Sequence, residues 1–185
     1  MQLYNENDIL AKLRSNNADT QKEAFNQVVR YYSEKLYWHV RKMVLSHDDT
    51  NDIVQNTFIK AWLNIDLFRG EAKLSTWLYK IAINESVNFL KKQRTQNHIS
   101  IDDSDVFLLD KLPGDEYFDG DALQLKLQRA ILTLPEKQRL VFNMRYYDEL
   151  PYEEISEILS TSVGALKASY HHAYKKIENF FTEEH

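Results

Sequence analysis

The chain has 185 residues, of which 43% are hydrophobic and 28% charged, and its formal net charge is −5. This composition is typical of a globular protein with one ordinary domain or two small ones. The absence of cysteine excludes disulfides, thiolate zinc sites and cysteine nucleophiles. No apolar run reaches the roughly 18 residues of a membrane span, and the first residues lack the basic start of a secretory signal. We therefore expect a soluble, cytoplasmic protein without direct membrane insertion.

Glycine and proline are rare in the first part of the chain, where residues 1–112 contain one glycine and no proline. Sheets need turns that draw on these residues, so this part is predicted to be helical. No glycine-rich phosphate loop, nucleophile elbow or HExxH motif occurs, and the six histidines are scattered except for one adjacent pair. The sequence thus predicts no enzyme, no cofactor and no metal site.

The distribution of charge divides the chain into three segments. Residues 1–94 hold 14 basic and 11 acidic residues, residues 95–120 hold one basic and seven acidic, and residues 121–185 hold eight basic and ten acidic. The middle segment lacks helical periodicity and contains two of the four glycines. We predict an all-α protein in which an acidic linker, 95–120, joins two small helical domains, 1–94 and 121–185.

Four helices are predicted in the first domain, over residues 8–14, 20–44, 49–64 and 75–92. The second should begin at Thr20, because Glu23 three residues later has the spacing of a capping box. Its apolar residues recur close to every 3.6 positions, as expected for a helix with one buried face. In the third helix, polar residues form a second face opposite the apolar one. That second face is available to a partner or to solvent.

The second domain should also contain four helices, over residues 122–132, 135–146, 152–159 and 162–180, with Pro135 as the first residue of its helix and Ser162 as a cap. A short helix, a three-residue turn and a longer helix have the spacing of a helix-turn-helix. Many helical hairpins share this spacing, so a hairpin with a solvated outer face fits equally well.

One face of the predicted helix 75–92 carries an aromatic, two amides and two cations: Trp77, Lys80, Asn84, Asn88 and Lys91. Such a surface suits single-stranded nucleic acid, because bases stack on aromatic rings and cations hold phosphates. The alternative is an ordinary amphipathic helix whose C-terminal cations interact with the helix dipole.

Three segments resemble the extracytoplasmic-function (ECF) type of RNA polymerase sigma factor. They are DIVQNTFIKAW (52–62), FRGEAKLSTWLYKIAIN (68–84) and the segment 134–177, which starts LPEKQRLVF and ends HHAYKKI. They occur in the family's order, cover nearly the whole chain and flank an acidic linker. The resemblance implies a non-enzymatic subunit that binds core polymerase and recognises the −10 and −35 promoter elements.

The family's residue roles transfer to the first domain position by position. The helix from Asp52 is expected to dock on the clamp coiled coil of the largest polymerase subunit through Asp52, Gln55, Asn56 and Lys60. The loop 66–73 resembles the loop that captures a flipped −10 base, and Trp77 either packs this loop or stacks on a base. The implied contacts with the −10 element are Phe68, Arg69, Lys73, Lys80, Asn84 and Lys91.

In the second domain the resemblance implies −35 contacts by Arg145, Tyr152, Glu153, Lys167, Ala168, His171 and His172. The chain departs from the family here, because Ser169 and His172 stand where arginines are common. Neutral histidine lacks the two-pronged donor that arginine presents to guanine. We therefore expect contact with the −35 element to be weaker than in typical members, or more dependent on pH.

The implied partners are core RNA polymerase, promoter DNA and an anti-sigma factor, which in this family is often membrane-anchored. The acidic linker either imitates nucleic acid in a polymerase channel or is a solvated tether. Two other functions fit parts of the pattern: a DNA-binding regulator that acts without polymerase, and a helical adaptor without a nucleic-acid role. The loop 66–73 favours the sigma factor over the regulator, because a sensor domain needs no single-strand pocket.

Overall fold

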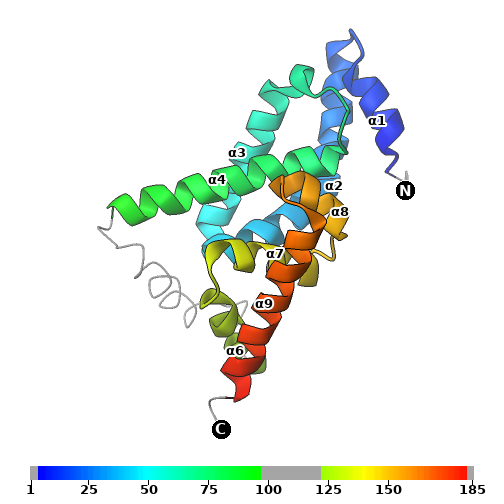
Figure 1. The fold of residues 1–185 in the computed structure, drawn as a ribbon. Coiled ribbons are helices and arrows are strands. Elements are labelled where there is room, and N and C mark those ends of the chain that lie inside the picture. The colour runs from blue at the N-terminus through cyan, green and yellow to red at the C-terminus, as the bar shows by residue number, and fades with distance from the viewer. Residues whose placement is uncertain (1–3, 97–121, 183–185) are drawn as a thin grey trace.

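The computed structural model describes residues 4–96 and 122–182, which form α-helices and one short 3₁₀ helix, with no strand among these residues (Figure 1). The elements are α1 Glu6–Leu13, α2 Ala18–Val44, α3 His47–Leu63, η1 Ile65–Leu67, α4 Leu74–Gln96, α6 Ala122–Leu132, α7 Glu136–Tyr146, α8 Tyr152–Leu159 and α9 Val163–Thr182. The all-α prediction is confirmed. The predicted acidic linker lies outside the described residues from position 97 onward, whereas Thr95 and Gln96 belong to α4.

The N-terminal group of helices is organised around α2, which packs against α1, α3 and α4. The apolar stripe predicted on this helix is buried at Phe25, Val28, Tyr32, Leu36 and Val40. Every third or fourth residue of α2 therefore enters the core, as the helical period requires.

The starts of the first helices depend on asparagine and serine side chains. The Asn17 side chain accepts hydrogen bonds from the backbone N–H of Asp19 at 2.9 Å and of Thr20 at 3.1 Å. The predicted capping box at Thr20 is therefore wrong, because Asn17 satisfies these amides three residues earlier. At the other end of α2, Leu45 takes a left-handed conformation (φ 58°) and Ser46 then caps α3.

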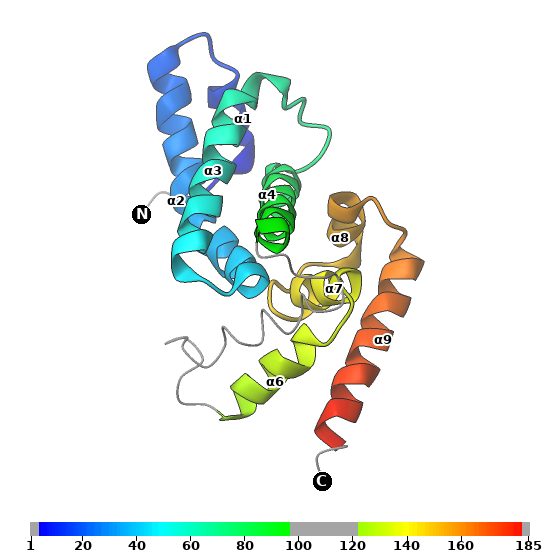
Figure 2. The same ribbon diagram turned by 90° about the vertical axis from the view of Figure 1, so that its left-hand side faces the viewer.

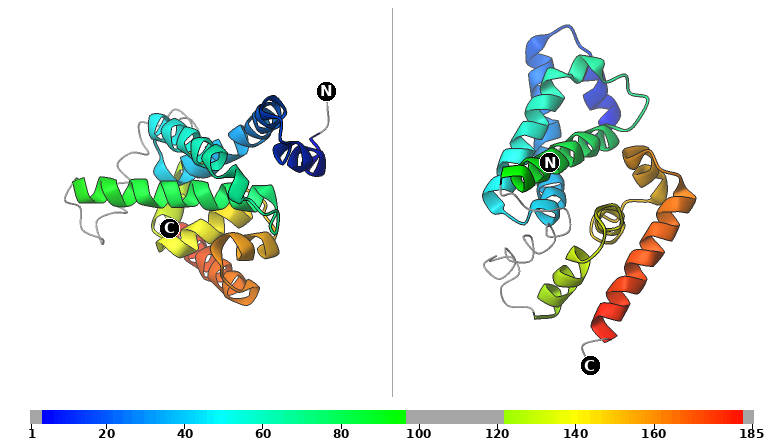
Figure 3. Two further views of the ribbon diagram at one scale, coloured as in Figure 1. Left: turned by 90° about the horizontal axis from the view of Figure 1, so that it is seen from above. Right: turned by 60° about the vertical axis from the view of Figure 1, so that its left-hand side comes forward.

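The C-terminal group has a core of its own, formed by Ile131, Leu134, Phe142, Ala173 and Ile177. Its α8, three-residue turn and α9 form the predicted helix-turn-helix, and α9 runs along the outside of the group (Figure 3). The backbone N–H of Ala165 donates to Ser162 Oγ at 3.3 Å, so the predicted cap is confirmed. Pro135 precedes α7 as its N-cap residue and not, as predicted, as its first helical residue.

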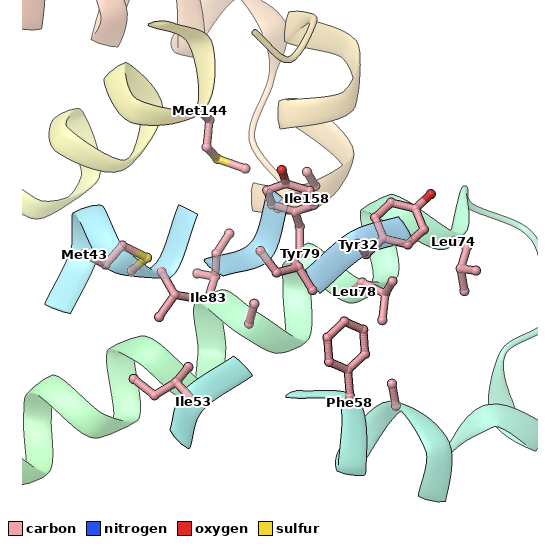
Figure 4. Close-up of a cluster of buried hydrophobic side chains, with 14 of the residues drawn as sticks. Tyr32, Met43, Ile53, Phe58, Leu74, Leu78, Tyr79, Ile83, Met144 and Ile158 are labelled. Atoms are coloured by element: carbon pink, nitrogen blue, oxygen red, sulfur yellow. The ribbon is translucent and has the colours of Figure 1, made fainter. Parts of the chain in front are cut away.

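The two groups of helices are packed together. Helix α4 lies between α3 and α8 (Figure 2), and α8 contacts α4 while α7 contacts α2. Met144 of α7 and Ile158 of α8 are buried beside Tyr79 of α4 in one continuous apolar cluster (Figure 4). We call this contact the seam.

Charged side chains are buried within the seam. Asp148, between α7 and α8, lies with its Oδ2 2.5 Å from His39 Nδ1 and its Oδ1 3.6 Å from Lys42 Nζ, and the exposed fractions of the three side chains are 5%, 0% and 8%. Burial lowers the pKa of Lys42, although the Asp148 carboxylate raises it in part. This cluster ties the C-terminal group to α2.

Candidate nucleic-acid and partner interfaces

A wide apolar groove runs between α2 and α3, with a volume of about 1000 Å³. Its floor is formed by the aromatic rings of Phe25, Phe58 and Trp62, whereas the predicted partner contacts Asp52 and Gln55 lie along its edge. Both polar side chains are exposed. An apolar floor with a polar edge is the composition of a protein-binding surface.

The other two predicted partner contacts, Asn56 and Lys60, are exposed on α3 but do not line this groove. Lys60 Nζ donates to Glu85 Oε1 of α4 at 2.5 Å. The predicted polar face is therefore not one continuous groove wall, because Asp52 and Gln55 line the groove whereas Lys60 contacts α4. A partner that contacts all four residues must extend beyond the groove.

The loop between η1 and α4 encloses a small pocket of about 180 Å³. Its lining includes three residues named from the sequence, Phe68, Arg69 and Lys80, together with Trp77. The rings of Phe68 and Trp77 are tilted by 34° with centroids 5.0 Å apart, which confirms that Trp77 packs against the loop. The pocket is smaller than the roughly 300–1,000 Å³ of drug-sized sites. Its lining combines two aromatic rings and two cations with one carboxylate, Glu71, and the rings and cations suit one nucleobase with its phosphate.

The remaining candidates for −10 contact continue the surface beyond this pocket. Asn84 and Lys91 are exposed further along α4, and Asn84 lies one turn after Lys80. Lys73 lies outside the pocket lining, and its ammonium bonds to Glu154 of α8 across the seam. Hydrogen bonding to Glu154 raises the pKa of Lys73. In this arrangement Lys73 is occupied by the C-terminal group.

Three of the predicted −35 contacts meet around one tyrosine ring. The guanidinium carbon of Arg145 lies 5.1 Å from the centroid of the Tyr152 ring, and Lys167 Nζ lies 5.8 Å from it. Arg145 also donates to the backbone oxygen of Leu150 at 3.1 Å. Residues from α7, α8 and α9 are therefore held together as one cationic surface by the fold of the helix-turn-helix.

The other −35 candidates are exposed. Glu153 lies in the first turn of α8, and Ala168, His171 and His172 lie on the outer side of α9. The two imidazole rings are neighbours on the helix, with centroids 6.1 Å apart and planes inclined by 61°.

The sequence reasoning missed five residues that the structure places at or behind these surfaces. His39, Lys42 and Asp148 form the buried cluster of the seam, and Glu6 and Arg14 of α1 hydrogen-bond to the loop around the pocket. One feature of the sequence could have indicated the first cluster: His39 and Lys42 lie next to the apolar stripe of α2, which suggests that they are buried. The contact of Arg14 with the loop spans 55 residues and has no local signature.

None of the described helices is both long enough and apolar enough to cross a bilayer.

Comparison with known proteins places both groups of helices in one family. Residues 28–96 match the family model for Sigma-70 region 2, and residues 124–177 match that for Sigma-70, region 4. The ECF RNA polymerase sigma factor SigW of Bacillus subtilis is 33% identical over 157 residues, or 80% of this chain and 84% of SigW.

Two solved structures share the fold. CnrH, solved in complex with the cytosolic domain of CnrY, superposes with a TM-score of 0.69 at 21% identity over 97% of this chain and 99% of CnrH. The sigma factor RpoE, solved in complex with the anti-sigma factor NepR from Bartonella quintana, superposes with a TM-score of 0.65 at 20% identity over 85% of this chain and 96% of RpoE.

Proposed function

The chain belongs to the ECF sigma factors of RNA polymerase, which direct promoter-specific initiation, and we propose that it does so with two modules. Residues 1–94 bind core polymerase and the −10 element, and residues 121–185 bind the −35 element. The observation that carries this assignment is the small pocket beside Phe68, Trp77 and Lys80. We propose no catalytic role, and we place the protein's action in the cytoplasm with polymerase.

The −10 contact consists of the capture of one base in the loop pocket. Extraction of a base from the duplex costs a few kcal/mol, which stacking and edge hydrogen bonds in a pocket offset. Phe68 supplies an aromatic surface, Arg69 and Lys80 supply cations for phosphate, and Asn84 supplies an amide for a base edge. Lys73 and Lys91 extend the cationic surface along the strand.

Core polymerase binds across α3. Asp52 and Gln55 lie at the edge of an apolar groove, and Asn56 and Lys60 extend the contact toward α4. An elongated helical partner fits this combination of apolar floor and polar edge. The clamp coiled coil of the largest polymerase subunit is such a partner.

The −35 element binds the helix-turn-helix with α9 in the major groove. Arg145 and Tyr152 lie where backbone contacts fix register, and Glu153 offers only its backbone N–H because its carboxylate repels phosphate. Lys167, Ala168, His171 and His172 face the bases. Only one of these four is a permanent cation, so binding of −35 DNA by the isolated module is weak and polymerase supplies the remaining affinity.

We expect the seam to open when the two modules bind separate promoter elements, because α8 contacts α4 in this structure. The 25 residues from 97 to 121 have a maximum reach of roughly 85 Å at about 3.3–3.6 Å per residue. The chain between the modules is therefore long enough to let them separate.

We also propose that an anti-sigma factor binds this chain and blocks the α2–α3 groove. RpoE, which has the same fold, was solved in complex with the anti-sigma factor NepR. The groove offers a competing helix an apolar surface lined by aromatic side chains. A membrane-anchored partner is compatible with this arrangement, since the groove faces outward from the molecule.

The test is transcription with core polymerase on promoters selected from a random library, with Phe68→Ala as the diagnostic variant. With the wild-type chain, transcription is expected to start at one position on each selected promoter. The variant is expected to bind core polymerase normally but not to direct initiation. Normal transcription by the variant contradicts the pocket assignment. DNA binding without any affinity for core polymerase indicates instead a regulator that acts alone, and the absence of both indicates an adaptor.

A further inference from the structure

Helix α1 contacts both ends of the loop that forms the base pocket. Arg14 Nη2 donates a hydrogen bond to the backbone oxygen of Arg69 at 2.9 Å, near the start of the loop. The backbone N–H of Leu74, the first residue of α4, donates to Glu6 Oε1 at 2.9 Å, where the loop ends. The two contacts span 55 and 68 residues of sequence. They are tertiary restraints on the loop that no local turn supplies.

The contact of Arg14 with the loop depends on a glycine. Gly70 has a φ of +75°, a conformation that side chains disfavour, and a Cβ at this position would collide with Arg14 Nη2. The guanidinium therefore lies directly against the backbone of the loop. Because Gly70 has no side chain, the guanidinium of Arg14 has room to approach the backbone of the loop.

Glu6 fixes the other wall of the pocket. Its carboxylate accepts a charge-assisted hydrogen bond from the N-terminus of α4 and interacts favourably with the helix dipole. The first turns of α4 carry Trp77 and Lys80, which line the pocket opposite the loop. The position of these two side chains therefore depends on where Glu6 holds the start of the helix.

Helix α1 is itself anchored. Ile9 and Leu13 are buried in the core, and the helix packs along α2. The match to Sigma-70 region 2 begins only at residue 28, so it assigns no part to α1. A rigidly held helix outside the matched region thus hydrogen-bonds to both walls of the candidate pocket.

We propose that Glu6 and Arg14 are positioning residues for base capture, and that α1 sets the shape of the −10 pocket. The proposal rests on the assignment of the loop as the −10 site. Loss of either contact lets the loop and the start of α4 separate, so the flipped base loses its stacking surface. Because a stacked base contributes about 1–3 kcal/mol, the affinity for a captured base should fall about 5- to 150-fold.

The experiment uses reconstituted holoenzyme and a single strand that wild-type holoenzyme selects from a random pool. Binding is measured to this strand and to versions in which each base in turn is removed to leave an abasic sugar. In the wild type, removal of one particular base should weaken binding. Arg14→Ala and Glu6→Ala should bind the intact strand no more tightly than the wild type binds that abasic strand, with unchanged affinity for core polymerase.

Two matched controls separate positioning from general stability. Glu6→Gln keeps an acceptor oxygen for Leu74 but loses the charge, so it should retain part of the discrimination between the intact and the abasic strand. Lys12→Ala removes a cation of α1 that forms an ion pair with Asp8 on the same helix. Gly70→Ala disturbs the same contact from the loop side, because its new Cβ collides with Arg14 Nη2, but it also strains the loop backbone at φ +75° and therefore only supplements Arg14→Ala. The proposal is supported if both Arg14→Ala and Gly70→Ala no longer distinguish the intact strand from the abasic strand.

Each other outcome has a defined meaning. Full discrimination between the intact and the abasic strand by Arg14→Ala overturns the positioning role and leaves the base pocket standing. If no base removal affects the wild type, the base-capture function itself is wrong. Equal loss in Lys12→Ala also overturns the proposal, because the effect then follows the stability of α1 and not its two contacts with the loop.

Discussion

The replacement of Asp148 by alanine should open the seam between the two modules. The Asp148 carboxylate contacts His39 and Lys42 of α2 at 2.5 and 3.6 Å, and its side chain is 5% exposed. Removal of one member of a buried ion pair costs about 3–5 kcal/mol, because the partner charge stays buried without compensation. Lys42 is that partner, and its pKa is already lowered by burial.

This energy acts on the contact between modules, because Asp148 belongs to the C-terminal group and both of its partners belong to α2. At about 1.36 kcal/mol per tenfold change, a loss of about 3–5 kcal/mol shifts the equilibrium between closed and open forms by roughly 150- to 5,000-fold. The substitution does not change the apolar contact of Met144 and Ile158 with Tyr79. Because the charged contacts are lost, the open form should rise steeply in population, while each module stays folded.

The assay is energy transfer between dyes on the two modules. The chain has no cysteine, so Asn88→Cys in α4 and Asn179→Cys in α9 provide two unique attachment positions. Asp148→Ala should lower the transfer efficiency with unchanged helical circular dichroism. Glu157→Ala, which removes an exposed carboxylate of α8, serves as the control and should leave transfer unchanged. Equal transfer efficiency in the wild type and Asp148→Ala refutes the role of the buried cluster in closing the seam.

Three further predictions concern the candidate interfaces. Phe68→Ala and Asn84→Ala should each abolish run-off transcription but leave core binding intact in a co-elution assay; transcription at the wild-type level by both excludes the base pocket. Asp52→Ala and Gln55→Ala should each weaken core binding by about 2- to 30-fold, since a polar interface contact contributes about 0.5–2 kcal/mol, and unchanged affinity in a titration of labelled chain with core polymerase places the contact elsewhere. His172→Arg should strengthen holoenzyme binding to a guanine-containing −35 fragment by about 5- to 150-fold, because arginine makes a two-pronged contact worth about 1–3 kcal/mol; equal gains on a scrambled fragment show a phosphate contact instead.

The sequence allowed the helices to be predicted because their burial follows a local period. On α2, the stripe from Phe25 to Val40 is apolar at helical spacing and is buried as predicted. Helix ends were less predictable, because more than one residue near each end is of a type that can cap a helix. Asn17 and Thr20 both suit an N-cap position, and only the packed structure shows that Asn17 occupies it.

The candidate interfaces were predicted where function lies in one segment and missed where it depends on tertiary contact. Phe68 and Lys80 lie 12 positions apart on a loop and its following helix, so a motif identifies them together. Arg14 and Asp148 act through partners 55 and 109 residues away. Their roles depend on how α1 and the C-terminal group pack, and no periodicity or motif encodes that packing.

The most direct test of the central claim is reconstitution of the purified chain with core RNA polymerase, followed by transcription from a promoter library. The account predicts that the chain co-elutes with core polymerase and that transcripts begin at fixed distances downstream of paired −10 and −35 sequences. A chain that fails to associate with core polymerase, or an assembled complex that initiates no more selectively than core polymerase alone, contradicts the account.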